Sequence, residues 1–126
     1  MTPQREALDL VLDKLEAENN YNIVPFALPK DGGISVEITG SEDKGRSLNL
    51  QHGSTDLTVL FLCKNETQAT AFDTLCEIGN RLSRLGEIKG ETVQVTGAGV
   101  RSGAGLVGND GGFYIYSMIA RIGIYF

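Results

Sequence analysis

The glycine-rich segment at residues 97–112 is the first candidate for chemistry. It holds seven glycines, and Gly97, Gly99 and Gly103 are spaced as in loops that bind the phosphates of a dinucleotide. Such a loop needs a helix directly after it, because the N–H groups at the helix N-terminus hold the anion. The sequence predicts strands on both sides instead, so we expect a flexible loop that binds no cofactor, with a turn at residues 109–112.

A second phosphate-binding pattern, GSEDKGRS at residues 40–47, fails for a related reason. Arg46 stands where a P-loop has lysine, and the residues that follow alternate as a strand and open no helix. Glu42 and Asp43 would also repel a phosphate group. We interpret this segment as a hairpin loop.

Side chains that could act as nucleophiles, bases or metal ligands are few and scattered. His52, the only histidine, lies beside a glycine between two predicted strands, which is typical of a surface turn. Cys63 and Cys76 have twelve residues between them, a spacing that matches no zinc motif, and neither has a neighbour in sequence that would activate it. We expect two reduced core thiols, no catalytic residues, no metal site and no enzymatic activity.

Length and charge restrict the classes of function further. The chain of 126 residues suits a single domain over residues 1–126. The net charge of −5 disfavours sequence-specific binding of nucleic acid, which needs clustered lysine and arginine. We expect no cleaved export signal and no segment that spans a membrane.

The elements that would position any site follow from hydrophobic periodicity. Leu8, Val11, Leu12 and Leu15 predict a first helix that Thr2 caps, and a second helix is predicted from Asn65 to Gly86. Strands are predicted at 34–39, 47–51, 57–64, 92–96 and 113–126, while the prolines in YNIVPFALP (21–29) indicate an edge segment or a long loop. The order α-β-β-β-α-β-β predicts an α+β fold, in which about five mostly antiparallel strands form a sheet with two helices on one face.

The face of the sheet opposite the helices is the informative one. The last strand is apolar on both faces, and a strand of that kind left exposed would be an aggregation hazard. We therefore predict self-association, unless the YNIVPFALP segment covers this second face. The subunit-interface candidates lie on two strands and in the glycine-rich loop, where Arg101 and Asp110 would pair across a boundary or remain solvated: Leu60, Leu62, Arg101, Asp110, Phe113, Ile115, Ile119 and Arg121.

Several segments resemble the tail terminator proteins of long-tailed bacteriophages and prophages, often labelled minor capsid proteins. The resemblance covers most of the chain and is clearest in GISVEI (33–38) and in GSTDLTVLFLCKNETQATAFDTLCEIGNRLSRL (53–85). Gln68 stands in the first turn of the second helix as in that family, ALPKDGGISV (27–36) is similar to the family's entry into its first strand, and the aromatic last strand fits. The run of glycines departs from the family's pattern.

The resemblance implies a structural protein of the virion, assembled in the cytoplasm of the host bacterium. It implies a homohexameric ring that caps the tail tube, stops its polymerisation and offers the surface for head–tail joining. The implied partners are further copies of the chain, the tail tube protein and a head-completion or connector protein. The alternative is a small α+β ligand-binding or regulatory domain that uses the glycine-rich loop as a lid.

Overall fold

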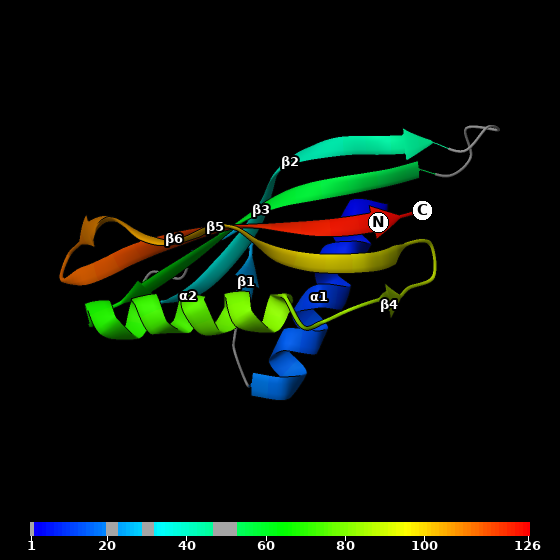
Figure 1. Cartoon of the computed structure of the whole chain (residues 1–126). Coiled ribbons are helices and arrows are strands. Elements are labelled where there is room, and N and C mark those ends of the chain that lie inside the picture. The colour runs from blue at the N-terminus through cyan, green and yellow to red at the C-terminus, as the bar shows by residue number, and fades with distance from the viewer. Residues whose placement is uncertain (1, 20–22, 29–31, 47–52) are drawn as a thin grey trace.

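The protein folds as an α+β domain in which two helices pack on one face of a mixed, curled sheet (Figure 1). The structure is a computed structural model that describes all residues except 1, 20–22, 29–31 and 47–52, and it does not describe the side chains of 18, 19 and 43–46. In the described part of the chain the elements are α1 (Pro3–Asn19), β1 (Ile23–Pro25), β2 (Gly33–Arg46), β3 (Gly53–Asn65), α2 (Gln68–Leu82), β4 (Ile88–Lys89), β5 (Gln94–Asp110) and β6 (Phe113–Tyr125).

The sheet has the strand order β1-β2-β3-β6-β5-β4. Its one parallel pair joins β1 to β2, so the sheet is mixed but mostly antiparallel, as expected. It has six strands in the described residues instead of about five. The expectation missed β4, which is too short to produce a periodic pattern, and its edge segment at residues 21–29 contains the short edge strand β1. β1 is an edge strand that ends at Pro25, and an edge suits a residue without an N–H group.

Both helices begin and end for local reasons. The Thr2 side chain accepts a hydrogen bond from the backbone N–H of Arg5 at 3.2 Å, which confirms the predicted cap of α1. α2 begins at Gln68 rather than Asn65, because Asn65 still belongs to β3 and its side chain accepts a bond from the Thr67 N–H. It ends at Leu82, before the predicted Gly86, because the following turn tightens: the N–H groups of Arg84 and Leu85 each donate to the carbonyl three residues earlier.

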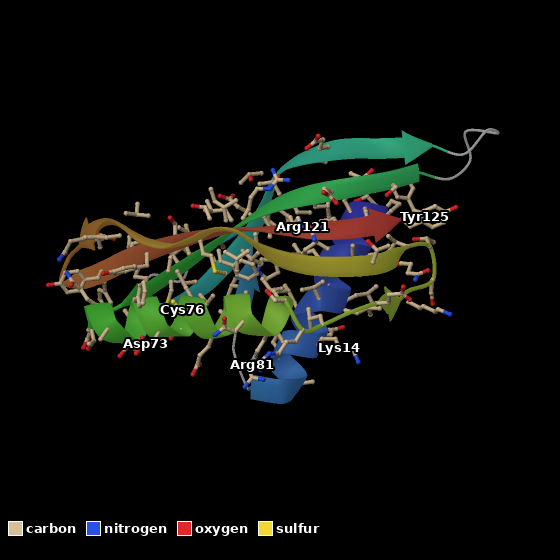
Figure 2. The ribbon with its side chains drawn as sticks, viewed as in Figure 1. Lys14, Asp73, Cys76, Arg81, Arg121 and Tyr125 are labelled. Atoms are coloured by element: carbon tan, nitrogen blue, oxygen red, sulfur yellow. The ribbon has the colours of Figure 1, made fainter. Side chains whose placement is uncertain are left out.

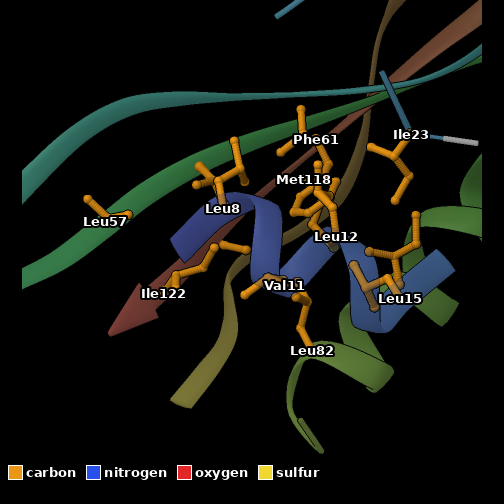
Figure 3. Packing of buried hydrophobic residues seen from close by; sticks show 14 of the residues in the cluster. Leu8, Val11, Leu12, Leu15, Ile23, Leu57, Phe61, Leu82, Met118 and Ile122 are labelled. Atoms are coloured by element: carbon orange, nitrogen blue, oxygen red, sulfur yellow. The ribbon is translucent and has the colours of Figure 1, made fainter. Parts of the chain in front are cut away.

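One hydrophobic cluster lies between the helices and the sheet. Figure 3 shows Leu8, Val11, Leu12 and Leu15 of α1 lying among Phe61 of β3, Met118 and Ile122 of β6 and Leu82 of α2. The even-numbered residues of β6 from Met118 to Ile124 are all buried, as the alternation in the sequence predicted. The last strand is a single long element, also as predicted.

Two predicted loops are strands. Residues 40–46 continue β2 and pair with β3 as far as Arg46 opposite Gly53, so the expected hairpin loop at 40–47 is wrong over all its described residues. The expected loop at 97–112 is wrong up to Asp110, because those residues belong to β5 and pair with β6. In both cases a long neighbouring strand supplies partners that override the local preference of glycine for loops. The predicted strand at 47–51 and the predicted turn at His52 lie outside the described residues.

Candidate functional site

The face of the sheet that the helices leave uncovered is the candidate functional site. Leu57, Val59 and Phe61 of β3 are fully buried on the helix side, so the alternate residues Leu60 and Leu62 point to the opposite face. Directly paired residues of antiparallel strands share a face, and Leu60 pairs with Ile119 of β6. We call this side the uncovered face.

An apolar ridge, made of Leu60, Leu62, Ile115 and Ile119, crosses the middle of the uncovered face. Leu60 and Ile119 are paired, and Leu62 lies opposite Ser117, next along the same two strands. Three of the four side chains are half-buried and Ile119 is 37% exposed. The ridge therefore brings together four of the eight residues expected at a subunit interface, and Phe113 and Arg121, at odd-numbered positions of β6, lie on the same face.

Beside the ridge, β5 presents a surface almost without side chains. Between Gln94 and Asp110 at its ends, its positions on the uncovered face are Gly or Ser: Gly97, Gly99, Ser102, Gly105 and Gly108, paired with Gly123, Arg121, Ile119, Ser117 and Ile115. We call these five residues the glycine strip. A Cβ atom built on any of its four glycines meets nothing within 4 Å, and none of the four has a positive φ. Neither packing nor backbone conformation inside this chain therefore requires glycine there, and the strip leaves the backbone open to close approach.

β5 follows β6 with repeated irregularities. The register between the two strands shifts four times: between Val95 and Gly97, Val100 and Ser102, Ser102 and Gly105, and Leu106 and Gly108. Each shift inserts one extra residue into β5, which is the geometry of a β-bulge and bends the strand. Arg101 stands at one of these insertions, directly before the residue that pairs with Ile119, and its side chain is exposed.

One end of the uncovered face is polar. Arg121 and Tyr125 lie in the C-terminal half of β6 (Figure 2). A guanidinium nitrogen of Arg121 lies 3.9 Å from a carboxylate oxygen of Asp56. Gly123 stands between them, where an added Cβ would lie 2.7 Å from Thr96 Oγ1. Glycine is needed at this position because the Asp56 and Thr96 side chains converge over it.

At the opposite end, Lys64 joins β3 to the tip of the β5–β6 hairpin. Its ammonium group lies 3.0 Å from Asp110 Oδ2 and 5.3 Å from the centre of the Phe113 ring. The Lys64 side chain is only 7% exposed, whereas that of Asp110 is 68% exposed. Asp110 thus has an ion-pair partner within its own chain, which sequence reasoning missed because 46 residues separate the two.

The segment after β1 borders the uncovered face without crossing it. Phe26, Ala27 and Leu28 line a shallow pocket of about 120 Å³ together with Ser35, Glu37 and Leu62. The Phe26 N–H donates to the Val36 carbonyl oxygen at 2.7 Å, and the Arg5 guanidinium lies 5.2 Å from the centre of the Phe26 ring. The proposed coverage by residues 21–29 therefore reaches only the margin beside Leu62, as far as the described residues show.

Both cysteines are free thiols. Cys63 is buried, and burial raises the pKa of its thiol to about 11, although a hydrogen bond with Thr74 opposes the shift. Such a thiol is an unreactive core group at neutral pH. Cys76 is only half-buried and lines a pocket between α2 and β5, so its assignment to the core was only partly right. Among the described residues, no group of three or more His, Cys, Asp or Glu side chains converges as a metal site.

Comparison with known proteins adds no family. No protein-family model matches the chain, and no curated protein gives a significant match. None of the helices in the described ranges is both long and apolar enough to cross a membrane.

Proposed function

We propose that the chain is a structural subunit that assembles with copies of itself into a homohexameric ring, in the manner of phage tail terminator proteins. The observation that carries this proposal is the uncovered face, where an apolar ridge lies beside a strip without side chains. A monomer gains nothing from exposing both together, whereas a neighbouring copy that covers them removes apolar area from water. In this proposal the ring caps the tail tube of a virion, ends its growth and presents a surface for head–tail joining.

The glycine strip supports a protein neighbour rather than a small ligand. Glycine in a strand weakens it, because it adds conformational entropy to the unfolded chain and packs no side chain. A cost repeated at four positions of β5 is offset where another backbone approaches closely. The pocket beside Leu62, at the margin of the uncovered face, measures about 120 Å³, which is below the range of typical ligand sites.

The arrangement of β5 disfavours the alternative, a ligand-binding domain with a glycine-rich lid. A lid must leave a cavity and return to it, whereas residues 94–110 pair with β6 along their length. The resemblance of residues 33–38 and 53–85 to tail terminators also favours the structural role. The partners that follow from it are the tail tube protein and a head-completion or connector protein.

Light scattering coupled to size-exclusion chromatography, with negative-stain imaging, tests the proposal. We expect six-fold rings of the wild-type chain, alone or after addition of purified tail tube protein. Ile119→Arg in the ridge and Gly105→Val in the strip should abolish the rings and leave the circular dichroism spectrum unchanged. Ala69→Arg, on the exposed surface of α2, is the matched control and should assemble normally.

Two results would contradict the ring proposal. Rings that persist in both the Ile119→Arg and the Gly105→Val variants would remove the uncovered face from assembly. A wild-type chain that forms no ring under any of these conditions, and that gains thermal stability with a metabolite, would return the ligand-binding alternative.

A further inference from the structure

A second apolar surface lies along the outer edge of β5. It consists of Val100, Leu106 and Val107, whose side chains are 42%, 56% and 61% exposed. We call these three residues the edge patch. Leu106 and Val107 are the most exposed large apolar side chains among the described residues. Apolar side chains that gather at one exposed edge mark a candidate interface.

The edge patch lies on the other side of the sheet from the apolar ridge. Val100 pairs with Ala120, which is fully buried in the core between the helices and the sheet. Leu106 pairs with Tyr116, whose ring meets the Phe72 ring of α2 edge-on, with the ring centres 6.1 Å apart. Since directly paired residues of antiparallel strands share a face, Val100 and Leu106 point to the helix side. Figure 1 shows α2 running alongside the β5–β6 hairpin on this side.

No strand covers β5 beside the edge patch. β4 pairs with β5 only at Gln94 and Val95, so in the described part of the chain the outer edge has no neighbouring strand from Thr96 onward. The four register shifts of β5 interrupt the regular row of backbone groups that a further strand would need. This edge is therefore better suited to burial through side chains than to strand addition.

The exposed large apolar side chains of the described residues divide between two surfaces. Ile119 and Tyr125 point to the uncovered face, and Phe26 lies at its margin. The other four are the edge patch and Phe72, which lies next to it. Away from the uncovered face, such side chains are therefore concentrated in one place.

A six-fold ring needs two different contact surfaces on every subunit. The rotation that relates neighbours in such a ring cannot turn a surface to face its own copy, so each contact joins two unlike surfaces. A face that contacts its own copy forms a two-fold dimer instead. The uncovered face can therefore supply only one side of the ring contact, and a surface that points elsewhere must supply the other. The edge patch is the exposed apolar surface that meets this requirement in the described part of the chain.

We infer that the ring is built head to tail, with the edge patch of each copy packed on the uncovered face of the next. This inference rests on the proposed function and names the surface that the neighbouring copy contributes. Leu106 and Val107 of one copy lie against Leu60 and Ile119 of the next, and both apolar surfaces leave water. The glycine strip carries no large side chain that would keep the neighbour away from the ridge.

Leu106→Arg tests whether the edge patch takes part in assembly. Leu106 is 56% exposed, so an arginine there should not disturb the fold, but assembly would bury its guanidinium group in an apolar contact. We expect the rings to be lost and the circular dichroism spectrum to be unchanged, under the conditions in which the wild type forms rings. Asp13→Arg, on the exposed surface of α1, is the matched control and should keep the rings.

A mixture of two variants tests the head-to-tail arrangement directly. Leu106→Arg keeps an intact uncovered face, and Ile119→Arg keeps an intact edge patch. Neither variant should associate with itself, whereas an equimolar mixture should form a heterodimer through the single intact contact and grow no further. In sedimentation equilibrium, the dissociation constant of the mixture should be at least about tenfold below that of either variant alone.

Three outcomes would overturn the inference: rings that persist in Leu106→Arg, a Leu106→Arg dimer in which the uncovered face pairs with itself, or a mixture that stays monomeric. The ring proposal is judged separately, by the wild type. Wild-type rings together with any of these outcomes would leave the ring standing and remove the edge patch from it. A heterodimer in the mixture without wild-type rings would leave the head-to-tail contact standing and refute the ring.

Discussion

Replacing Gly79 with alanine tests whether close packing of α2 on β5 matters to the stability of the fold. Gly79 is buried inside α2, where glycine is a poor helix former. An alanine Cβ there would lie 2.6 Å from Val100 Cγ2 and 3.1 Å from Met118 Sδ. Carbon atoms in favourable contact lie about 3.5–4.0 Å apart, so Val100 would have to retreat by about 1 Å.

Two effects of opposite sign decide the result. Alanine in place of glycine in a helix interior stabilises by about 1 kcal/mol. Overpacking a well-packed contact costs about 1–3 kcal/mol. Met118 is flexible and adapts readily, so the contact with Val100 sets the cost. We expect Gly79→Ala to lower the free energy of unfolding by about 1 kcal/mol in net terms, with α2 displaced from β5.

A double-mutant cycle with Val100→Ala isolates this contact. Val100→Ala removes the methyl group that meets the new Cβ, so in that background Gly79→Ala should be neutral or stabilising by up to about 1 kcal/mol. Urea unfolding followed by circular dichroism measures all four chains, at a concentration low enough to keep them monomeric. If Gly79→Ala stabilises the wild type as much as it stabilises the Val100→Ala chain, the packing argument is refuted.

Two further predictions concern Lys64 and Cys63. Asp110→Asn removes the carboxylate that lies 3.0 Å from the nearly buried Lys64 ammonium group. The change should lower the free energy of unfolding by only about 1 kcal/mol, because the Asp110 side chain is exposed. Urea unfolding measures this loss with Asp73→Asn as the control, and equal effects of the two changes would contradict the prediction. Burial raises the pKa of Cys63 from 9.0 to about 11, so between these values the unfolded thiol loses its proton while the folded one keeps it. The stability that this provides is complete below pH 9 and is lost as the pH rises toward 11, by up to about 1.4 kcal/mol per pH unit. Cys63→Ala should therefore show a smaller decline in urea unfolding over that interval, and parallel declines would disprove the assignment.

The parts of the fold that local chemistry determines could be predicted from the sequence. The Thr2 cap, the apolar face of α1 and the alternation along β6 each depend on residues a few positions apart, and the structure confirms all three. The limits of α2 were less predictable. Asn65 has the side chain of a good cap but is held in β3 by pairing with Tyr114, and Gly86 is preceded by a tight turn that ends the helix earlier.

The candidate site was harder to predict because distant pairing creates it. Residues 97–110 look like a loop by composition, and only the pairing with β6 makes them a strand. One signal was present in the sequence: Gly97 and Gly99 are two residues apart, which is the period of a strand face. The ion pair between Lys64 and Asp110 had no comparable signal, since it depends on where the tip of the hairpin folds back.

The glycines of this chain differ in what requires them, and that difference bears on function. Gly111 and Gly112 have φ values of 59° and 93° in the turn between β5 and β6, a conformation that favours glycine. Gly123 has ordinary backbone geometry but no space for a side chain. The glycines of the strip have both ordinary geometry and open space around them, so the folded chain by itself would accept alanine at each. In the ring proposed above, a neighbouring copy against the strip would supply the constraint that the single chain lacks, and the strip faces the same side as the apolar ridge. Four glycines that the folded chain does not require therefore lie together on the uncovered face.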